Sequence, residues 1–218
     1  MCKPLLLFMV LVCLMPAVVP AQQYLIGDHN LLLMPTAYSI PAKSSYFTDY
    51  ELIFLNYTIA LGSRTHIGVY TLFPITSSFL ESITLEVKQN YLRSSSFQGA
   101  LIGSYTPKAN LISIGNVFSI GKRKTNFHIG ASAWGNLSES DWEVVLMAGL
   151  QTRIKKSASL LIEYTNFSSL LDDFNGLISL GVRLRSDKIA WEIGGIRPLE
   201  YAGDLFLWPF LKATAFFN

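Results

Sequence analysis

The sequence predicts an all-β protein, namely a closed, antiparallel, up-and-down β-barrel of about twelve strands. Three observations predict this fold. Apolar and polar residues alternate over segments of about ten residues, which is the period of a strand and not of a helix. Short polar turns alternate along the chain with connections that are mostly longer. After residue 21, no apolar stretch is long enough for a membrane-spanning helix, although 50% of the residues are hydrophobic.

The alternation is clearest in two segments. Segment 177–185 places aliphatic residues on one face and polar or small residues on the other, with Ile178, Leu180, Val182 and Leu184 opposite Ser179, Gly181, Arg183 and Arg185. Segment 125–134 does the same, with Phe127, Ile129, Ala131 and Ala133 opposite Asn126, His128, Gly130, Ser132 and Trp134. Segment 142–153 also alternates, but Val145 and Met147 interrupt its polar face.

Counting along the chain, we expect twelve strands. Strand 29–36 contains Pro35, which suits only a strand end or a sheet edge. Strand 44–61 is too long for one span, and its phase slips near Ile53–Leu55, which indicates a bulge or protrusion. Ten is the fallback count, because these first two strands are the least regular. The expected ranges are 29–36, 44–61, 65–73, 82–92, 97–106, 110–120, 125–135, 141–153, 158–166, 176–185, 188–197 and 205–217.

The composition of the two faces favours a transmembrane barrel. If segment 177–185 spans a bilayer, turning Arg183 or Arg185 toward lipid would cost roughly 2–4 kcal/mol near the midplane. The apolar face therefore meets lipid, and the polar face lines the lumen. A candidate lumen-facing network of charged side chains follows: Glu86, Lys88, Glu143, Arg153, Glu163, Arg183, Arg185, Glu192 and Lys212. The same residues would be a solvated face on a soluble barrel, so a soluble, periplasmic, lipocalin-like barrel that binds an apolar ligand remains an alternative.

Residues 1–21 are typical of a cleavable signal peptide. Lys3 is their only charge, an apolar stretch runs from Leu5 to Met15, and small residues precede a cut after Ala21. This leaves 22–218 as a single barrel domain. Cys2 and Cys13 lie inside the signal, so the mature chain has no cysteine for disulfides or thiolate chemistry. The net charge is +2 and becomes +1 without Lys3, which gives no electrostatic case for nucleic acid as a partner.

The last residues, Leu211–Asn218, resemble the terminal strand of outer-membrane proteins, with spaced apolar residues and a final aromatic residue. Asn218 follows that aromatic residue and departs slightly from the pattern. Together with Leu33–Ala37, Tyr50–Leu52 and the hairpin Leu61–Val69, this makes the chain resemble the small outer-membrane barrels of Gram-negative bacteria, a class that includes OmpA- and OmpX-like proteins and uncharacterised families. The resemblance implies integral outer-membrane localisation, outer-membrane lipids and the barrel-assembly machinery as partners, and no known reaction.

Little in the sequence indicates chemistry. The histidines His29, His66 and His128 lie on different expected strands without metal-ligand spacing, so we expect neither a metal nor a cofactor. Ser132 shares the face of His128 but is about 13 Å away along a strand. A serine from a neighbouring strand could still approach His128, which keeps an outer-membrane lipid hydrolase, a lipase or deacylase, as an alternative. The pair Asp172-Asp173 is expected to be a solvated loop tip.

The sequence therefore predicts a non-enzymatic, integral outer-membrane barrel that is either structural or a narrow passive channel. Twelve strands enclose less space than the aqueous channel of a 16-stranded porin. Oppositely charged side chains on the inner face could close such a lumen by pairing. No residue pattern in the chain indicates an oligomeric state.

Overall fold

The computed structural model of the chain describes residues 25–72, 79–122, 124–139, 141–166, 176–199 and 207–218. The signal peptide expected at 1–21 and the acidic pair Asp172-Asp173 lie outside the described residues. Within the described ranges, no helix is long and apolar enough to cross a membrane.

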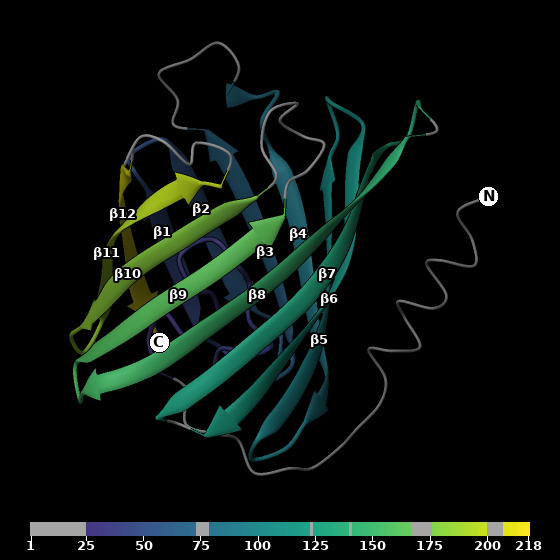
Figure 1. Cartoon of the computed structure of the whole chain (residues 1–218). Coiled ribbons are helices and arrows are strands. Elements are labelled where there is room, and N and C mark those ends of the chain that lie inside the picture. The colour runs from purple at the N-terminus through teal and green to yellow at the C-terminus, as the bar shows by residue number, and fades with distance from the viewer. Residues whose placement is uncertain (1–24, 73–78, 123, 140, 167–175, 200–206) are drawn as a thin grey trace.

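Twelve antiparallel strands in the described part of the chain form one closed barrel (Figure 1). Each strand pairs with its neighbours in sequence, and β1 pairs with β12 to close the sheet. Closure leaves no free edge, so the strands satisfy one another's backbone groups all round the barrel. The predicted fold class and strand count are confirmed. The strands are β1 (Ser45–Tyr50), β2 (Phe54–Ala60), β3 (Thr65–Leu72), β4 (Thr84–Arg93), β5 (Phe97–Thr106), β6 (Leu111–Lys122), β7 (Thr125–Asn136), β8 (Trp142–Lys155), β9 (Ala158–Asn166), β10 (Leu177–Arg185), β11 (Ile189–Pro198) and β12 (Trp208–Phe217).

The first expected strand, 29–36, is wrong. The segment makes one isolated antiparallel bridge, between Asn30 and Pro35, and lies inside the barrel instead of in its wall. Its sequence explains the difference, because 31–34 is a run of four apolar residues without alternation. Such a run suits a segment that is covered on all sides, whereas a barrel strand has one apolar and one polar face.

The second expected strand, 44–61, is two strands, β1 and β2. The chain reverses at Glu51 and Leu52, whose φ angles are 58° and 61°. Two successive residues with positive φ match the twist of a tight hairpin. The side chain of Asp49 helps, because its Oδ1 accepts the amide hydrogen of Leu52 at 2.8 Å. The count of twelve is therefore reached by a different division of the N-terminal region, and the phase slip near Ile53 marks this turn.

The two faces of the barrel differ sharply in polarity. On β10, Ile178, Leu180 and Leu184 are exposed on the outside, whereas Ser179 and Arg183 are buried inside. The other strands repeat this arrangement, and exposed apolar residues surround the barrel, among them Phe47, Tyr57, Val69, Leu85, Ile114, Phe127, Leu146, Ile162, Ile193 and Leu211. A soluble barrel would have the opposite polarity. The chain is therefore a membrane barrel of the outer-membrane type and not a soluble, lipocalin-like protein.

The two ends of the barrel carry different connections. At one end, called the turn end, β2–β3, β4–β5, β6–β7, β8–β9 and β10–β11 are joined by short turns. At the other, called the loop end, the connections are mostly longer, such as 73–83 and 199–207. Two loop-end connections are short, at 51–53 and 107–110. The chain enters β1 and leaves β12 at the turn end.

We expect Leu180→Arg, in the middle of β10 on the outer face, to destabilise the folded barrel by about 2–4 kcal/mol, because the charge would lie near the bilayer midplane. Ile189→Arg is the matched control at the turn end of β11, where the cost falls to about 0–1 kcal/mol. Reversible denaturant unfolding in phospholipid vesicles measures both changes. Equal, small effects of the two substitutions would contradict the lipid-facing assignment.

Candidate functional site

Residues 25–44 are called the N-terminal plug, and all of them up to Ile40 are buried or half-buried in the lumen (Figure 1, purple). The plug has little regular structure and is folded back on itself by turns. Thr36 N donates to His29 O at 3.0 Å, and Leu31 N donates to Met34 O at 2.7 Å. These bonds satisfy only part of the backbone, so the remaining polar groups of the plug depend on the barrel wall.

Two cations of the wall bind carbonyl oxygens at the centre of the plug. Arg183 Nη2 on β10 donates to Asn30 O at 2.5 Å and to Leu31 O at 3.3 Å. Lys212 Nζ on β12 donates to Leu31 O and, at 3.0 Å, to Leu32 O. Arg183 and Lys212 are 0% and 1% exposed, so their charges interact with protein groups instead of water.

Two further cations hold the earlier part of the plug. Lys88 Nζ on β4 donates to His29 O at 3.1 Å. Arg185 Nε on β10 donates to Ile26 O at 2.8 Å, and its Nη2 forms an ion pair with Asp28 Oδ1 at 2.7 Å. Asp28 thus places a negative charge of the plug beside the two arginines of β10, Arg183 and Arg185.

Carboxylates of the wall complete this arrangement. Glu163 on β9 accepts two amide hydrogens of the plug, from Leu33 at 2.7 Å and from Met34 at 3.0 Å. Glu192 on β11 lies between the cations and pairs with Arg183 at 2.5 Å and Lys212 at 3.2 Å. Removing one partner of a buried ion pair costs about 3–5 kcal/mol because it leaves the other charge uncompensated.

The nine predicted lumen residues therefore divide into groups. Those that bind the plug directly are Lys88, Glu163, Arg183, Arg185 and Lys212. Glu192 joins two of them, whereas Glu86 is half-buried and lines a cavity nearer the loop end. Within the described residues, Glu143 and Arg153 make no hydrogen bond or ion pair to the plug.

Apolar contacts add to the polar ones. Leu31, Leu32 and Met34 are fully or almost fully buried against Leu161 of β9 and other apolar wall residues. Two glycines of the wall leave room for this packing. A Cβ atom at Gly149 would overlap Leu31 Cδ1, and one at Gly181 would lie 2.9 Å from Leu32 Cδ2. Glycine on the inner face thus relieves crowding against the plug.

The histidines also serve the plug. His66 Nε2 on β3 accepts the amide hydrogen of Ile40 at 3.0 Å. Ser119 Oγ accepts the amide hydrogen of Ala37 at 2.8 Å and lies 2.7 Å from His128 Nδ1.

His29 belongs to the plug itself and stacks on the ring of Tyr46, with 3.8 Å between the centroids. Burial, followed by repulsion from Lys88, lowers the pKa of His29 well below its ordinary value. The plug therefore holds this imidazole neutral. In the described part of the chain, no group of three or more potential metal ligands is close enough to hold an ion.

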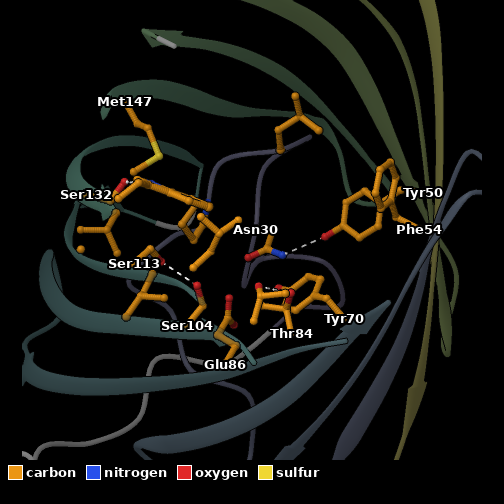
Figure 2. Close-up of a pocket in the computed structure, with 18 of the residues that line it drawn as sticks. Asn30, Tyr50, Phe54, Tyr70, Thr84, Glu86, Ser104, Ser113, Ser132 and Met147 are labelled. Carbon is orange, nitrogen blue, oxygen red and sulfur yellow. Dashed lines mark hydrogen bonds between the residues drawn. The ribbon is translucent and has the colours of Figure 1, made fainter. Parts of the chain in front are cut away.

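A cavity of about 620 Å³ lies between the plug and the loop end (Figure 2). Asn30, Leu33 and Pro35 of the plug form part of its lining, together with inward-facing residues of the wall. Neither the plug nor this cavity is predicted by the strand pattern of the sequence. The apolar run 31–34 is a signal for the plug, and Met147, one of two apolar residues that interrupt the polar face of β8, is a signal for the cavity.

Comparison with known proteins gives similarities of fold only. No protein-family profile and no curated protein matches the chain. The outer membrane protein Omp33 of Acinetobacter baumannii aligns with a TM-score of 0.46 at 8% identity, over 80% of this chain and 95% of that one. A triple mutant of the Rhodopseudomonas blastica porin aligns with a TM-score of 0.42 at 9% identity, over 75% of this chain and 55% of that one. LpxR from Salmonella typhimurium aligns with a TM-score of 0.41 at 9% identity, over 80% of this chain and 99% of that one.

This chain thus spans about half the length of the porin chain that it matches, at 55%. The assignment as a membrane barrel rests on the strand pairing and on the apolar outer face described above. The narrower resemblance to OmpA- and OmpX-like barrels stays a prediction.

We expect Gly149→Val to loosen the plug, because the added side chain would occupy the space of Leu31 Cδ1. Adding Leu31→Ala to the same chain should restore the fit, since it removes the overlapping atoms. Hydrogen exchange of the amides of Leu33 and Met34 in detergent micelles measures plug release. If the second substitution increases exchange further, the two residues do not compete for one space.

Proposed function

We propose that this protein is a non-enzymatic, integral outer-membrane barrel whose own N-terminal plug keeps the lumen closed to ions. It would be exported by the signal peptide at 1–21. Barrels of this class place their short turns in the periplasm and their longer loops outside the cell. The plug would then be attached at the periplasmic side, and the cavity would lie toward the cell exterior.

The burial of the charged residues that bind the plug is the observation that carries this proposal. A passive channel needs a continuous path of water from one end to the other. At the level of Arg183, Glu192 and Lys212, the side chains are at most 1% exposed. Their hydrogen-bonding groups are directed to one another and to plug carbonyls. If these contacts fill the lumen at this level, a passive channel exists only after the plug has left its seat.

Planar-bilayer recording tests the closed state. We expect the wild-type protein to give no conductance steps above background. Deleting residues 25–40 behind the export signal should produce steps, because the wall alone encloses the lumen. Heat-modifiable mobility on gels shows whether each variant is a folded barrel. Steady conductance of the wild type with the plug in place would contradict the proposal.

A point substitution avoids the risk that the deletion prevents folding. Glu163→Gln removes the charge that accepts two plug amide hydrogens, and an amide has only one oxygen to accept them. We expect brief openings that are absent in the wild type. Glu143→Gln is the matched control, since Glu143 is on the inner face of β8 but makes no hydrogen bond to the plug in the described structure.

One contact favours a second candidate function, hydrolysis of lipid. Ser119 on β6 supplies the serine from a neighbouring strand, with Oγ at 2.7 Å from His128 Nδ1. However, Ser119 accepts the Ala37 amide hydrogen, and both side chains are at most 1% exposed. No hydrogen-bond partner in the described structure orients His128 through Nε2, whereas the base of a catalytic triad has one. The pair is placed to hold the plug.

We accordingly expect no hydrolysis of phospholipid or acylated glycolipid by the wild type or by the variant lacking 25–40. The variant is the sharper test, because it exposes Ser119 and His128 to substrate. Release of fatty acid can be measured by mass spectrometry. Hydrolysis that appears on plug deletion and disappears in the additional variant His128→Ala would replace this proposal by the hydrolase.

A further inference from the structure

The cavity at the loop end has the size of a small-molecule site. Its volume of about 620 Å³ falls within the range of roughly 300–1,000 Å³ that ligand pockets occupy. The plug gives it a floor, with Leu33 and Pro35 among the lining residues. It is therefore a pocket with a closed bottom and not a segment of a through channel.

The pocket is apolar where the lumen of a membrane barrel is ordinarily polar. Ile102, Met147, Ile196 and Phe210 line it from four different strands. Trp134 on β7 adds an aromatic surface, with its ring nitrogen donating to Ser132 Oγ at 2.7 Å. Apolar area left facing water costs about 25 cal/mol per Å², so a lining of this kind favours an occupant with an apolar body.

The charged residues in the described lining of the pocket are acidic, whereas the cations Lys88 and Lys212 of the adjoining wall are directed to carbonyl oxygens of the plug. The described lining contains two carboxylates, Glu51 and Glu86, and no lysine, arginine or histidine. Glu51 is exposed in the β1–β2 turn, whereas Glu86 is half-buried and directed into the pocket (Figure 2). An anionic ligand, such as a fatty acid or a phosphate ester, would meet repulsion here, because no cation in the described lining compensates the two carboxylates.

Glu86 has the position of a ligand-binding group. In the described structure, no cation lies within 4.0 Å of its carboxylate, because the neighbouring Lys88 is directed to His29 O. Tyr70 lies beside Glu86 in the pocket wall, and Tyr50 accepts a hydrogen bond from Asn30 Nδ2 at 3.3 Å (Figure 2). The ring of Tyr50 already faces a cation, since Lys212 Nζ lies 5.3 Å from its centroid. The carboxylate of Glu86 and the phenol ring of Tyr70 remain to suit an ammonium ion, through charge and through the aromatic face.

We infer that this pocket binds a small amphipathic cation, with its ammonium group at Glu86 and its apolar or aromatic body against Met147, Trp134 and Phe210. The ligand enters from the loop end, since the plug closes the other side. This site lies in the lumen at the loop end, and binding there does not require the plug to move.

Three matched probes test the inference: 4-phenylbutylamine, 4-phenylbutanol and 4-phenylbutyrate, which share one body and differ in the head group. Binding to the full-length protein in lipid nanodiscs is measured by calorimetric titration, with empty nanodiscs as the blank for partition into lipid. We expect the amine to bind more tightly than the alcohol, and the carboxylate not to bind measurably.

Two substitutions locate the head group. Glu86→Gln should weaken binding of the amine about tenfold or more and leave the alcohol unchanged, because only the charged contact is lost. Glu143→Gln is the control for any loss of negative charge in the lumen and should change neither. Met147→Trp should reduce binding of both probes by filling the pocket.

Equal binding of amine and alcohol, with no effect of Glu86→Gln, would overturn the charge selection. Tighter binding of the carboxylate would overturn the ligand class. Heat-modifiable mobility of each variant separates a lost site from a lost fold. These results are independent of conductance, so failure of the closed-lumen proposal and failure of the ligand proposal are distinguishable.

Discussion

The rest of the structure depends on one arrangement, in which Arg183 and Lys212, paired with Glu192 between them, bind the backbone of the plug. An irregular segment inside a membrane barrel has polar backbone groups that no strand satisfies, and charged wall residues in a narrow lumen need partners. The plug backbone and the wall charges satisfy one another here, because Arg183 and Lys212 bind the carbonyl groups of residues 30–32. The plug is held inside the barrel for this reason, and it forms part of the lining of the pocket at the loop end.

Much of the barrel could be predicted from the sequence, because a strand with one lipid face and one lumen face alternates in polarity. Strand β10 follows that rule closely, and Arg183 fixes which face is inside. The N-terminal region could not be divided correctly by this rule. Leu31 and Leu32 are apolar and consecutive because they are surrounded by protein, and the turn at Glu51 contains neither glycine nor asparagine to indicate it.

The candidate site was accessible to sequence reasoning only in part. The residues that hold the plug lie at polar positions of alternating segments, among them Lys88, Glu163 and Lys212. The pattern therefore predicts that they face the lumen. What those charges bind could not be inferred, because their partners are backbone atoms, and backbone atoms have no signature in the side-chain pattern. The pocket had one weak signal in the sequence, Met147. Its apolar side chain interrupts a polar face of β8, and it lines the pocket instead of facing lipid.

The position of the plug before β1 has a consequence for the order of assembly. Its main partners lie on the last four strands: Glu163 is 130 residues from Leu33, and Lys212 is 180 residues from Leu32. Contacts of such sequence separation form late, because long chain loops must close first. The seat for residues 30–34 does not exist until β9 to β12 have paired, and β12 then closes on β1, which directly follows the plug. A segment that is synthesised before any strand of the barrel is thus among the last to be ordered, and a seated plug marks a completed barrel.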